Sequence, residues 1–138
     1  MLSLCYCIAE CWRMTETDLR KLETFQNKCL RQIHKIYYPN MITNVELHER
    51  SGVVSMESTI AKRRLKMVGH INRMRPERAP KITLRWTPLQ GRRKRPNITW
   101  RRTVEKDLSR LELTWGEAST LAQERRKWRS LLWPLAPP

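Results

Sequence analysis

Hydrophobic residues recur every three or four positions along the segment Thr15–Ile36, which is the pattern of an amphipathic helix. The recurring positions are Leu19, Leu22, Phe25, Cys29, Leu30, Ile33 and Ile36. Thr15 is followed three residues later by Asp18, a spacing that resembles a capping box and marks the start of the helix. Pro39 disfavours helical backbone at the residue before it and has no amide proton, so the helix should end at Tyr37–Asn40.

A second, shorter helix is predicted between Thr43 and Gly52. Thr43 should cap its N-terminus, and Glu46 should complete a second capping box. Gly52 should end the helix, because glycine readily adopts the left-handed conformation that is common just after a helix.

The third predicted helix covers residues 55–74 and has two contrasting faces. One face is hydrophobic and carries Met56, Ile60, Met67, Ile71 and Met74. The opposite, basic face carries Lys62, Lys66 and Arg73, with Arg63 on its flank. Arg64 falls within the hydrophobic stripe, so it must either extend its head group to solvent or meet an acid. Gly69 costs the helix about 1 kcal/mol relative to alanine unless a close neighbour requires the missing side chain.

Proline and glycine interrupt this pattern in residues 75–97. The stretch contains four of the eight prolines and one of the four glycines of the chain. Because both residues disfavour regular helix, we expect a basic, Pro-rich extended linker here, with a short strand at Lys81–Trp86.

The helical pattern returns after this linker, with hydrophobic positions at Trp100, Val104, Leu108 and Leu111. Thr114 and Glu117 have the spacing of a third capping box, which should start a single last helix over residues 115–132. Residues 98–133 would then form a C-terminal helical hairpin, followed by a frayed tail at 134–138.

These segments predict a mainly α fold, with about five amphipathic helices in a small and incomplete bundle. Residues 15–74 would be a three-helix segment, preceded at 1–14 by an apolar opening with no obvious packing partner. That opening is too short to span a bilayer and lacks the basic start of a signal peptide. We therefore expect a nuclear or cytoplasmic protein that is not secreted and does not bind a membrane.

Charge is unevenly distributed along the chain, whose net charge is +15. Residues 1–60 are neutral overall, and residues 104–138 carry a net +1. Residues 61–103 contain 15 Lys and Arg but a single acid, Glu77. A high local density of cations without counter-acids favours a surface that binds a polyanion such as nucleic acid.

Residues for catalysis do not occur at recognisable spacings. Two-metal chemistry needs converging carboxylates, but the two aspartates, Asp18 and Asp107, lie on the polar parts of two separate predicted helices. The sequence contains no nucleotide-binding, hydrolase or zinc-protease motif, and its cysteines have no histidine at a metal-ligand spacing. We expect no catalytic site, metal site or cofactor in this chain.

The basic middle third of the chain is the candidate binding surface. The run Arg92–Arg95 lies between glycine and proline and can follow a phosphate backbone or serve as a nuclear-import signal. Arg101 and Arg102 follow at a helix N-terminus, where free amide groups and the helix dipole favour phosphate. The candidate nucleic-acid-binding residues are Lys62, Arg63, Lys66, Arg73, Arg85, Arg92, Arg93, Lys94, Arg95, Arg101 and Arg102.

Two tryptophans, Trp86 and Trp100, flank the basic run and are candidates for stacking on bases. For Trp100 the register with Val104 and Leu108 favours core packing instead. The C-terminal hairpin also has the outline of a helix-turn-helix, although any antiparallel helical hairpin shares that outline.

Replacing Arg92–Arg95 by alanine should weaken binding to all nucleic-acid sequences alike, because phosphate contacts carry no sequence information. Filter binding with several unrelated sequences measures this effect. A loss confined to one sequence would instead favour base reading by a helix-turn-helix.

Four motifs occur in the order typical of one family: ECWRMTETDLRKLETFQNKCLRQI, RRLKMVGHINRM, GRRKRPNITWRRTVEKDL and LTWGEASTLAQERRKWRSLL. Together they cover residues 9–132 and resemble the C-terminal region of non-LTR (LINE-like) retrotransposon endonuclease–reverse transcriptases. The matching positions are Glu10, Trp12, Arg63, Arg64, Leu65, Gly69, His70, Met74, Gly91, Trp100, Arg101 and Arg102. The chain departs from the family pattern at LCYCIAE, KMVGH and KRPN, and Cys11 replaces the usual threonine.

The resemblance implies a parent RNA-directed DNA polymerase whose catalytic aspartates would lie upstream of Met1. Residues 1–14 would then be the remnant of the end of the polymerase region. On this reading the chain is a non-catalytic fragment that binds element RNA or target DNA. The alternatives are a structural module that packs on the missing polymerase body, for which the neutral residues 1–60 are suited, and a relic with no function.

Overall fold

The computed structural model describes residues 11, 14–86 and 99–133, and every regular element within these ranges is a helix. The helices are α1 (Glu16–Ile33), α2 (Asn44–Ser51), α3 (Met56–Asn72), α4 (Ala79–Arg85), α5 (Trp100–Ser109), α6 (Trp115–Leu121) and α7 (Arg125–Leu131). The predicted mainly α fold is therefore confirmed. None of the helices in the described ranges has the length and hydrophobicity needed to cross a membrane.

The first and third predicted capping boxes are formed. Thr15 Oγ1 accepts a hydrogen bond from the Asp18 amide at 3.2 Å, and the Asp18 carboxylate accepts one from the Thr15 amide at 3.1 Å. Thr114 and Glu117 make the same reciprocal pair at the start of α6. These bonds satisfy amide groups that have no partner within the helix, which fixes where each helix begins.

The second helix is capped less completely than predicted. Thr43 Oγ1 accepts a hydrogen bond from the Glu46 amide at 3.3 Å, but among the described contacts Glu46 makes no return bond, so this capping box is only half formed. Gly52 ends α2 with a φ of 63°, as its sequence position predicted.

The predicted end of the first helix at Tyr37–Asn40 is wrong, because the helix ends at Ile33, three residues before the hydrophobic repeat ends. Lys35 has a φ of 53°, which turns the chain away from the helix axis. The side chains of Phe25 and Ile33 are 50% and 69% exposed. The hydrophobic stripe predicted on α1 is therefore only partly buried.

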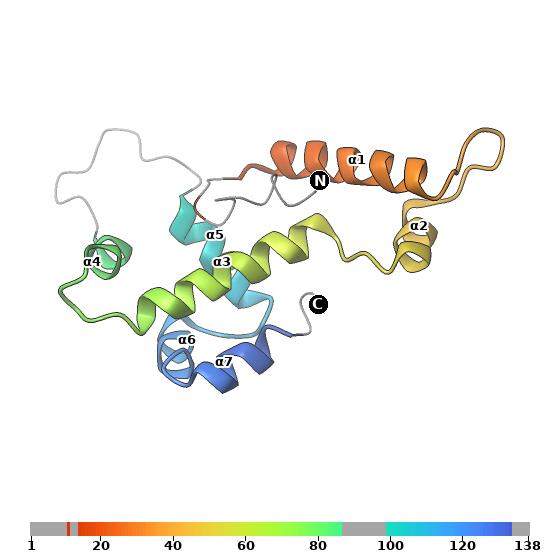
Figure 1. Ribbon diagram of the computed structural model, residues 1–138. Helices are drawn as coiled ribbons and strands as arrows, with labels where there is room; N and C mark the ends of the chain where they lie inside the picture. Colours follow the sequence, from red (N-terminus) through yellow and green to blue (C-terminus); the bar gives the residue numbers. More distant parts are fainter. Residues whose placement is uncertain (1–10, 12–13, 87–98, 134–138) are drawn as a thin grey trace, which may run out of the picture.

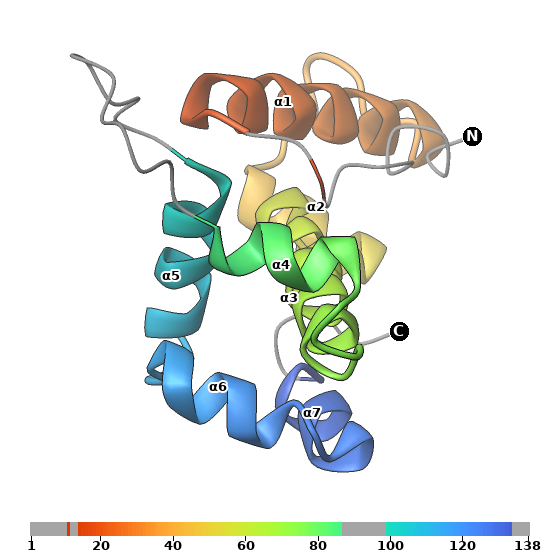
Figure 2. The same ribbon diagram turned by 90° about the vertical axis from the view of Figure 1, so that its left-hand side faces the viewer.

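Helix α3 runs through the middle of the molecule, with α1 on one side and α6 and α7 on the other (Figures 1 and 2). Near its N-terminus it packs against the chain entering α1, in a small cluster of Met14, Met56 and Ile60. Further along it packs against α5, α6 and α7, in the main core of Leu65, Val68, Val104, Leu108, Ala118, Ala122, Trp128 and Leu132.

Contact on two sides explains why the buried surface of α3 is wider than the predicted stripe. On a helical wheel with 100° per residue, the buried positions of α3 cover about 220° of the circumference. Met56 lies at one edge of this arc and Gly69 at the other. The predicted stripe lies at one edge of this arc, and Met67 and Met74 at that edge are only half-buried. The basic residues other than Arg64 occupy the remaining, more exposed arc.

The short strand predicted at Lys81–Trp86 is wrong, because these residues belong to or end the helix α4. Pro80 lies in the first turn of α4, where its missing amide proton costs no helical hydrogen bond. Lys81 Nζ donates to the carbonyls of Asn72 at 2.5 Å and Met74 at 3.0 Å. These bonds to the C-terminal end of α3 hold α4 in place, so residues 75–97 are not a continuous extended linker.

The single last helix predicted over residues 115–132 is also wrong, since it is divided into α6 and α7. The break falls at Ala122–Glu124. It allows Ala118 and Ala122 of one helix and Trp128 of the next to enter the same core. The C-terminal hairpin is therefore a three-helix unit.

Arg64 and Asp107 form a buried ion pair between α3 and α5, with Nε and Oδ2 3.1 Å apart and side chains 4% and 6% exposed. Of the two alternatives predicted for Arg64, the structure shows the acid partner and not an exposed head group. The placement of Asp107 on a polar helix surface is wrong, because it is the partner of Arg64. Burial is the largest influence on both groups: it raises the pKa of Asp107 and lowers the pKa of Arg64, and their mutual attraction offsets only part of this.

Candidate nucleic-acid interface

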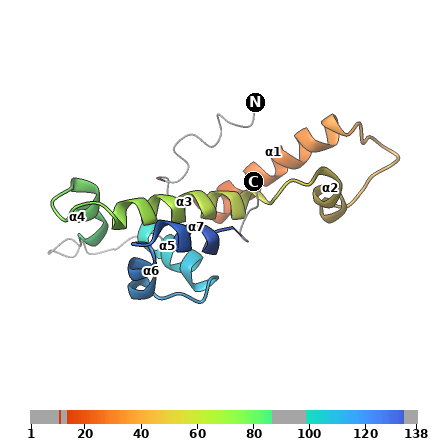
Figure 3. The same ribbon diagram turned by 60° about the horizontal axis from the view of Figure 1, so that its bottom comes forward.

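A groove with a volume of about 410 Å³ lies between α3 and α7, which pack against each other (Figures 1 and 3). We call it the α3–α7 groove. Its lining residues are Lys62, Lys66, His70, Arg73, Arg125, Trp128, Arg129, Leu132 and Trp133. More than half of them are basic, and none is acidic.

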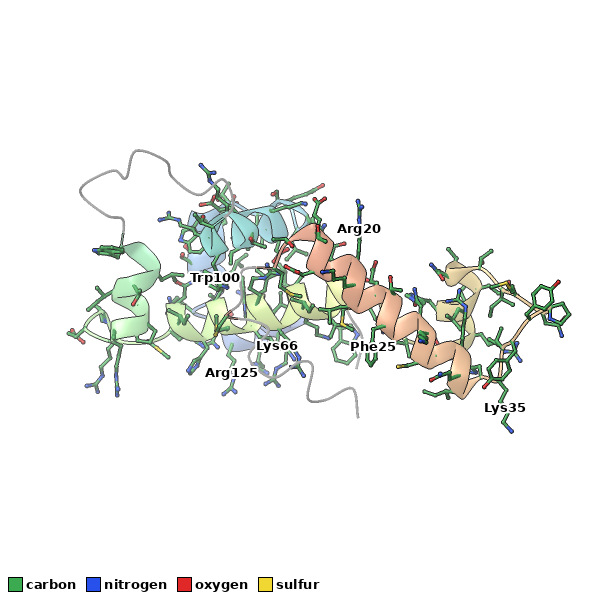
Figure 4. The ribbon with its side chains drawn as sticks, turned by 90° about the horizontal axis from the view of Figure 1, so that it is seen from above. Arg20, Phe25, Lys35, Lys66, Trp100 and Arg125 are labelled. Carbon is green, nitrogen blue, oxygen red and sulfur yellow. The ribbon has the colours of Figure 1, made fainter. Side chains whose placement is uncertain are left out.

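The cations of the groove come from two helices that are distant in sequence. On α3 they follow the spacing of one helix face, from Lys62 to Lys66 and on to Arg73, and on α7 Arg125 and Arg129 are one turn apart. Figure 4 shows Lys66 and Arg125 on the same side of α3, with Trp100 on the other side. None of these cations forms an ion pair with a carboxylate of the described residues.

Two cations of the groove have pKa values below their ordinary values. Burial lowers the pKa of Lys62, and the neighbouring charge of Lys66 lowers it further. Burial also lowers the pKa of Arg73, with a second contribution from Arg125 across the groove. Both effects disfavour the charged forms in the free protein, whereas an anion bound in the groove would favour the charged forms through its opposite charge.

Two contacts hold α7 against α3 and so define the groove. Trp128 Nε1 donates a hydrogen bond to the Leu65 carbonyl at 3.1 Å, and this tryptophan is 3% exposed. A Cβ at Gly69 would lie 2.2 Å from that same Nε1, so the glycine is required for the close approach. The sequence indicated that a close neighbour could explain Gly69, but it did not show that this neighbour is Trp128.

The basic side chain of Arg73 also has a structural contact. Its Nη1 donates to the Ala122 carbonyl at 2.7 Å, where α6 ends and the carbonyl has no partner within the helix. Arg73 therefore fixes the break between α6 and α7 in addition to lining the groove.

Positive charge continues beyond both ends of the α3–α7 groove. A neighbouring hollow of about 500 Å³ shares His70 and Arg73 with it and adds Arg75 and Arg78 near α4. Another, of about 530 Å³, shares Arg129 and Trp133 and adds Arg126. The three hollows form a continuous basic track along α3 and α7.

Only part of the sequence-predicted site gathers here. Lys62, Lys66 and Arg73 do so, whereas Arg101 pairs with Glu105 at 3.3 Å and lies over the ring of Trp115. Arg102 lines a different hollow, between the start of α1, α3 and α5, in which both signs of charge are present.

The remaining predicted cations are not part of the α3–α7 groove. Arg63 is half-buried on α3 and does not line it. Arg85 ends α4, and only its backbone is described. Arg92, Arg93, Lys94 and Arg95 lie outside the described residues.

The tryptophans singled out in the sequence lie in different surroundings. Trp100 is half-buried and packs against the main core, which agrees with the core-packing alternative. Trp86 is 63% exposed at the end of α4 and is available for stacking. Trp133, which the sequence did not single out, is 53% exposed and lines the α3–α7 groove.

Sequence reasoning also omitted Arg125 and Arg129 from the site. They lie in a segment that contains Glu117 and Glu124, and so carries little net charge. Their spacing of four residues was a usable signal, since it places both on one helix face. Glu124 pairs with Lys127 at 2.8 Å, which leaves the groove face of α7 basic.

The rest of the described surface offers no comparable site. Within the described ranges no group of three or more His, Cys, Asp or Glu side chains is arranged to hold a metal ion. An apolar hollow of about 540 Å³ lies between α3, α4 and the start of α5, and is lined by Met67, Ile71, Met74, Leu84 and Trp100 among others.

Comparison of the chain with known proteins finds no matching family model, no matching curated protein and no matching solved structure.

Proposed function

We propose that this chain binds nucleic acid through the phosphate backbone, using the cations of the α3–α7 groove. The observation that carries the proposal is the convergence of Lys62, Lys66, Arg73, Arg125 and Arg129 on one groove without any carboxylate in its lining. Two helices are held together there although their charges repel. Phosphate groups neutralise such a surface, and counterions released from the nucleic acid drive the binding.

The proposed origin is the C-terminal region of a non-LTR retrotransposon reverse transcriptase, acting as a binding module without polymerase activity of its own. The ordered sequence motifs support this origin, and two of their residues have clear structural roles. Gly69 admits Trp128, and Arg64 pairs with Asp107. Element RNA or target DNA is the proposed ligand, in the nucleus or the cytoplasm.

The test is a variant in which Lys66, Arg125 and Arg129 are all replaced by glutamine. These side chains are exposed and have no structural contact in the described residues, so the fold should persist. Each phosphate contact contributes about 0.9 to the slope of log K against log salt for duplex DNA and about 0.7 for a single strand. The slope should therefore fall by about 2.1 to 2.7, which weakens binding about 100- to 500-fold at 0.1 M salt.

The matched control replaces Arg20, Lys21 and Lys28 by glutamine, which removes the same charge from exposed positions of α1. Figure 4 shows Arg20 projecting away from the groove side. The control should keep a salt slope close to that of the wild type. Equal loss in both variants would show that only net charge matters, and no loss in either would exclude the groove.

A second candidate function is packing on a polymerase body. The observation in its favour is the exposed hydrophobic surface of α1, where Phe25 and Ile33 remain half or more exposed. A chain that aggregates alone and becomes monodisperse when joined to an upstream polymerase segment would support this function. The two functions use different faces and are compatible.

A further inference from the structure

Trp133 lines one end of the α3–α7 groove and lies two residues after the last residue of α7. Lys62 Nζ lies over its ring, 5.3 Å from the ring centroid, which is a cation–π contact. The side chain is nevertheless 53% exposed. An exposed ring that is held by a cation on one side offers its remaining surface to a second flat group, and nucleic-acid bases are such groups.

The lining of the groove combines two kinds of surface. The cations of α3 and α7 suit phosphate, whereas Trp128, Leu132 and Trp133 suit an apolar or aromatic group. A volume of about 410 Å³ admits a base with its sugar and phosphate, but not a double helix. In a duplex the faces of the bases are covered by their stacked neighbours, so a duplex would leave Trp133 without a partner.

Building on the proposed phosphate binding, we infer that the groove holds a single-stranded segment of nucleic acid with one base stacked on Trp133. Lys62 has two roles in this arrangement, since it holds the indole ring and contributes charge beside it. Stacking accepts any base, so this site adds affinity for single strands without reading their sequence.

The test compares Trp133→Leu with the wild type on three probes: oligothymidine of about 12 nucleotides, an abasic strand of the same length, and a duplex of the same length. Loss of one stacked base should weaken oligothymidine binding about 5- to 150-fold. Binding to the abasic strand and to the duplex should not change, and neither should the salt slope, because the phosphate contacts remain.

Two further variants keep the result interpretable. Trp133→Phe retains a flat ring and should restore most of the preference for oligothymidine over the abasic strand. Tyr38→Leu removes an aromatic residue that is 88% exposed in the loop after α1, and should leave all three probes unaffected. The preference is the ratio of the affinities for oligothymidine and for the abasic strand, both measured on the same protein sample. Partial unfolding of a variant reduces the active fraction equally for both probes, so this ratio does not change.

The inference is overturned if the wild type binds the abasic strand as tightly as oligothymidine, or if Trp133→Leu weakens both strands equally. Either result would still leave phosphate binding in place. Failure of the proposed function itself would give a different result, in which no probe binds in a salt-dependent way. A protein partner at Trp133 would give no preference for oligothymidine over the abasic strand, and Trp133→Leu would then leave binding of all three probes unchanged.

Discussion

Replacement of Gly69 by alanine should destabilise the fold by about 3 kcal/mol, since the new methyl group forces Trp128 out of its buried position. The added Cβ would lie 2.2 Å from Trp128 Nε1 and 2.5 Å from its Cδ1. The indole cannot move away without giving up its hydrogen bond to the Leu65 carbonyl and its place in the main core. Urea unfolding monitored by circular dichroism measures the change.

Gly116 provides the matched control. A Cβ at Gly116, in α6, would meet no atom within 4 Å. Alanine there should stabilise the protein by up to about 1 kcal/mol, because glycine is the poorer helix former. If both substitutions had the same effect, the contact between Gly69 and Trp128 would not hold α7 against α3. Because α7 supplies Arg125 and Arg129, Gly69→Ala should also reduce the salt slope of nucleic-acid binding.

Breaking the buried Arg64–Asp107 pair should cost about 3–5 kcal/mol in either single variant, Arg64→Met or Asp107→Leu. Each variant leaves one charge buried without its counter-charge. Replacing both residues together should be neutral, or stabilise the protein by about 1–4 kcal/mol, because the desolvation of both ions is then avoided. Urea unfolding of the four proteins gives the coupling energy.

Two observations favour a stabilising double substitution. The 3.1 Å approach of Nε to Oδ2 is close enough for an ion pair but is not aligned as a hydrogen bond, and Arg64 Nη1 has no hydrogen-bond partner in the described residues. In addition, burial raises the pKa of Asp107 despite the nearby arginine. A double variant as unstable as either single variant would contradict this account.

The raised pKa of Asp107 has a definite consequence for pH dependence. Its pKa in the folded state lies above the unfolded value, so the protonated carboxyl is the form that favours folding. The contribution of Asp107 to the free energy of unfolding is fully present at pH values below its pKa in the unfolded chain. This contribution is lost as the pH rises through its pKa in the folded protein. The double variant lacks the carboxyl and should lose this part of the pH profile.

Local sequence signals predicted where α1 and α6 begin and where α2 ends. The capping boxes at Thr15 and Thr114 and the left-handed glycine at Gly52 act through residues only three or four positions apart. Such contacts form whenever the local chain folds, so spacing alone is sufficient to predict them. The apolar repeat at Trp100, Val104 and Leu108 was predicted for the same reason.

Contacts between distant segments decided the features that the sequence misassigned. Helix α4 is held by bonds from Lys81 to carbonyls at the end of α3, and these outweigh the extended character of a Pro-rich segment. The helix expected over 115–132 is divided at Ala122–Glu124, where Arg73 Nη1 donates to the Ala122 carbonyl, and Trp128 of the second helix packs in the main core. Asp107 was predicted to lie on a helix surface, and only the tertiary structure shows that it is buried against Arg64.

The sequence by itself determined that this protein is helical and that its cations crowd into one third of the chain, because both follow from residue type and spacing. It also marked Arg64 as needing either solvent or an acid, and Gly69 as a cost to the helix unless a close neighbour required it. Only the tertiary structure decided which partners they have and which cations share a surface. Lys66 and Arg125 are 59 positions apart in the sequence, and they line one groove only because Trp128 packs against Gly69 and places α7 beside α3.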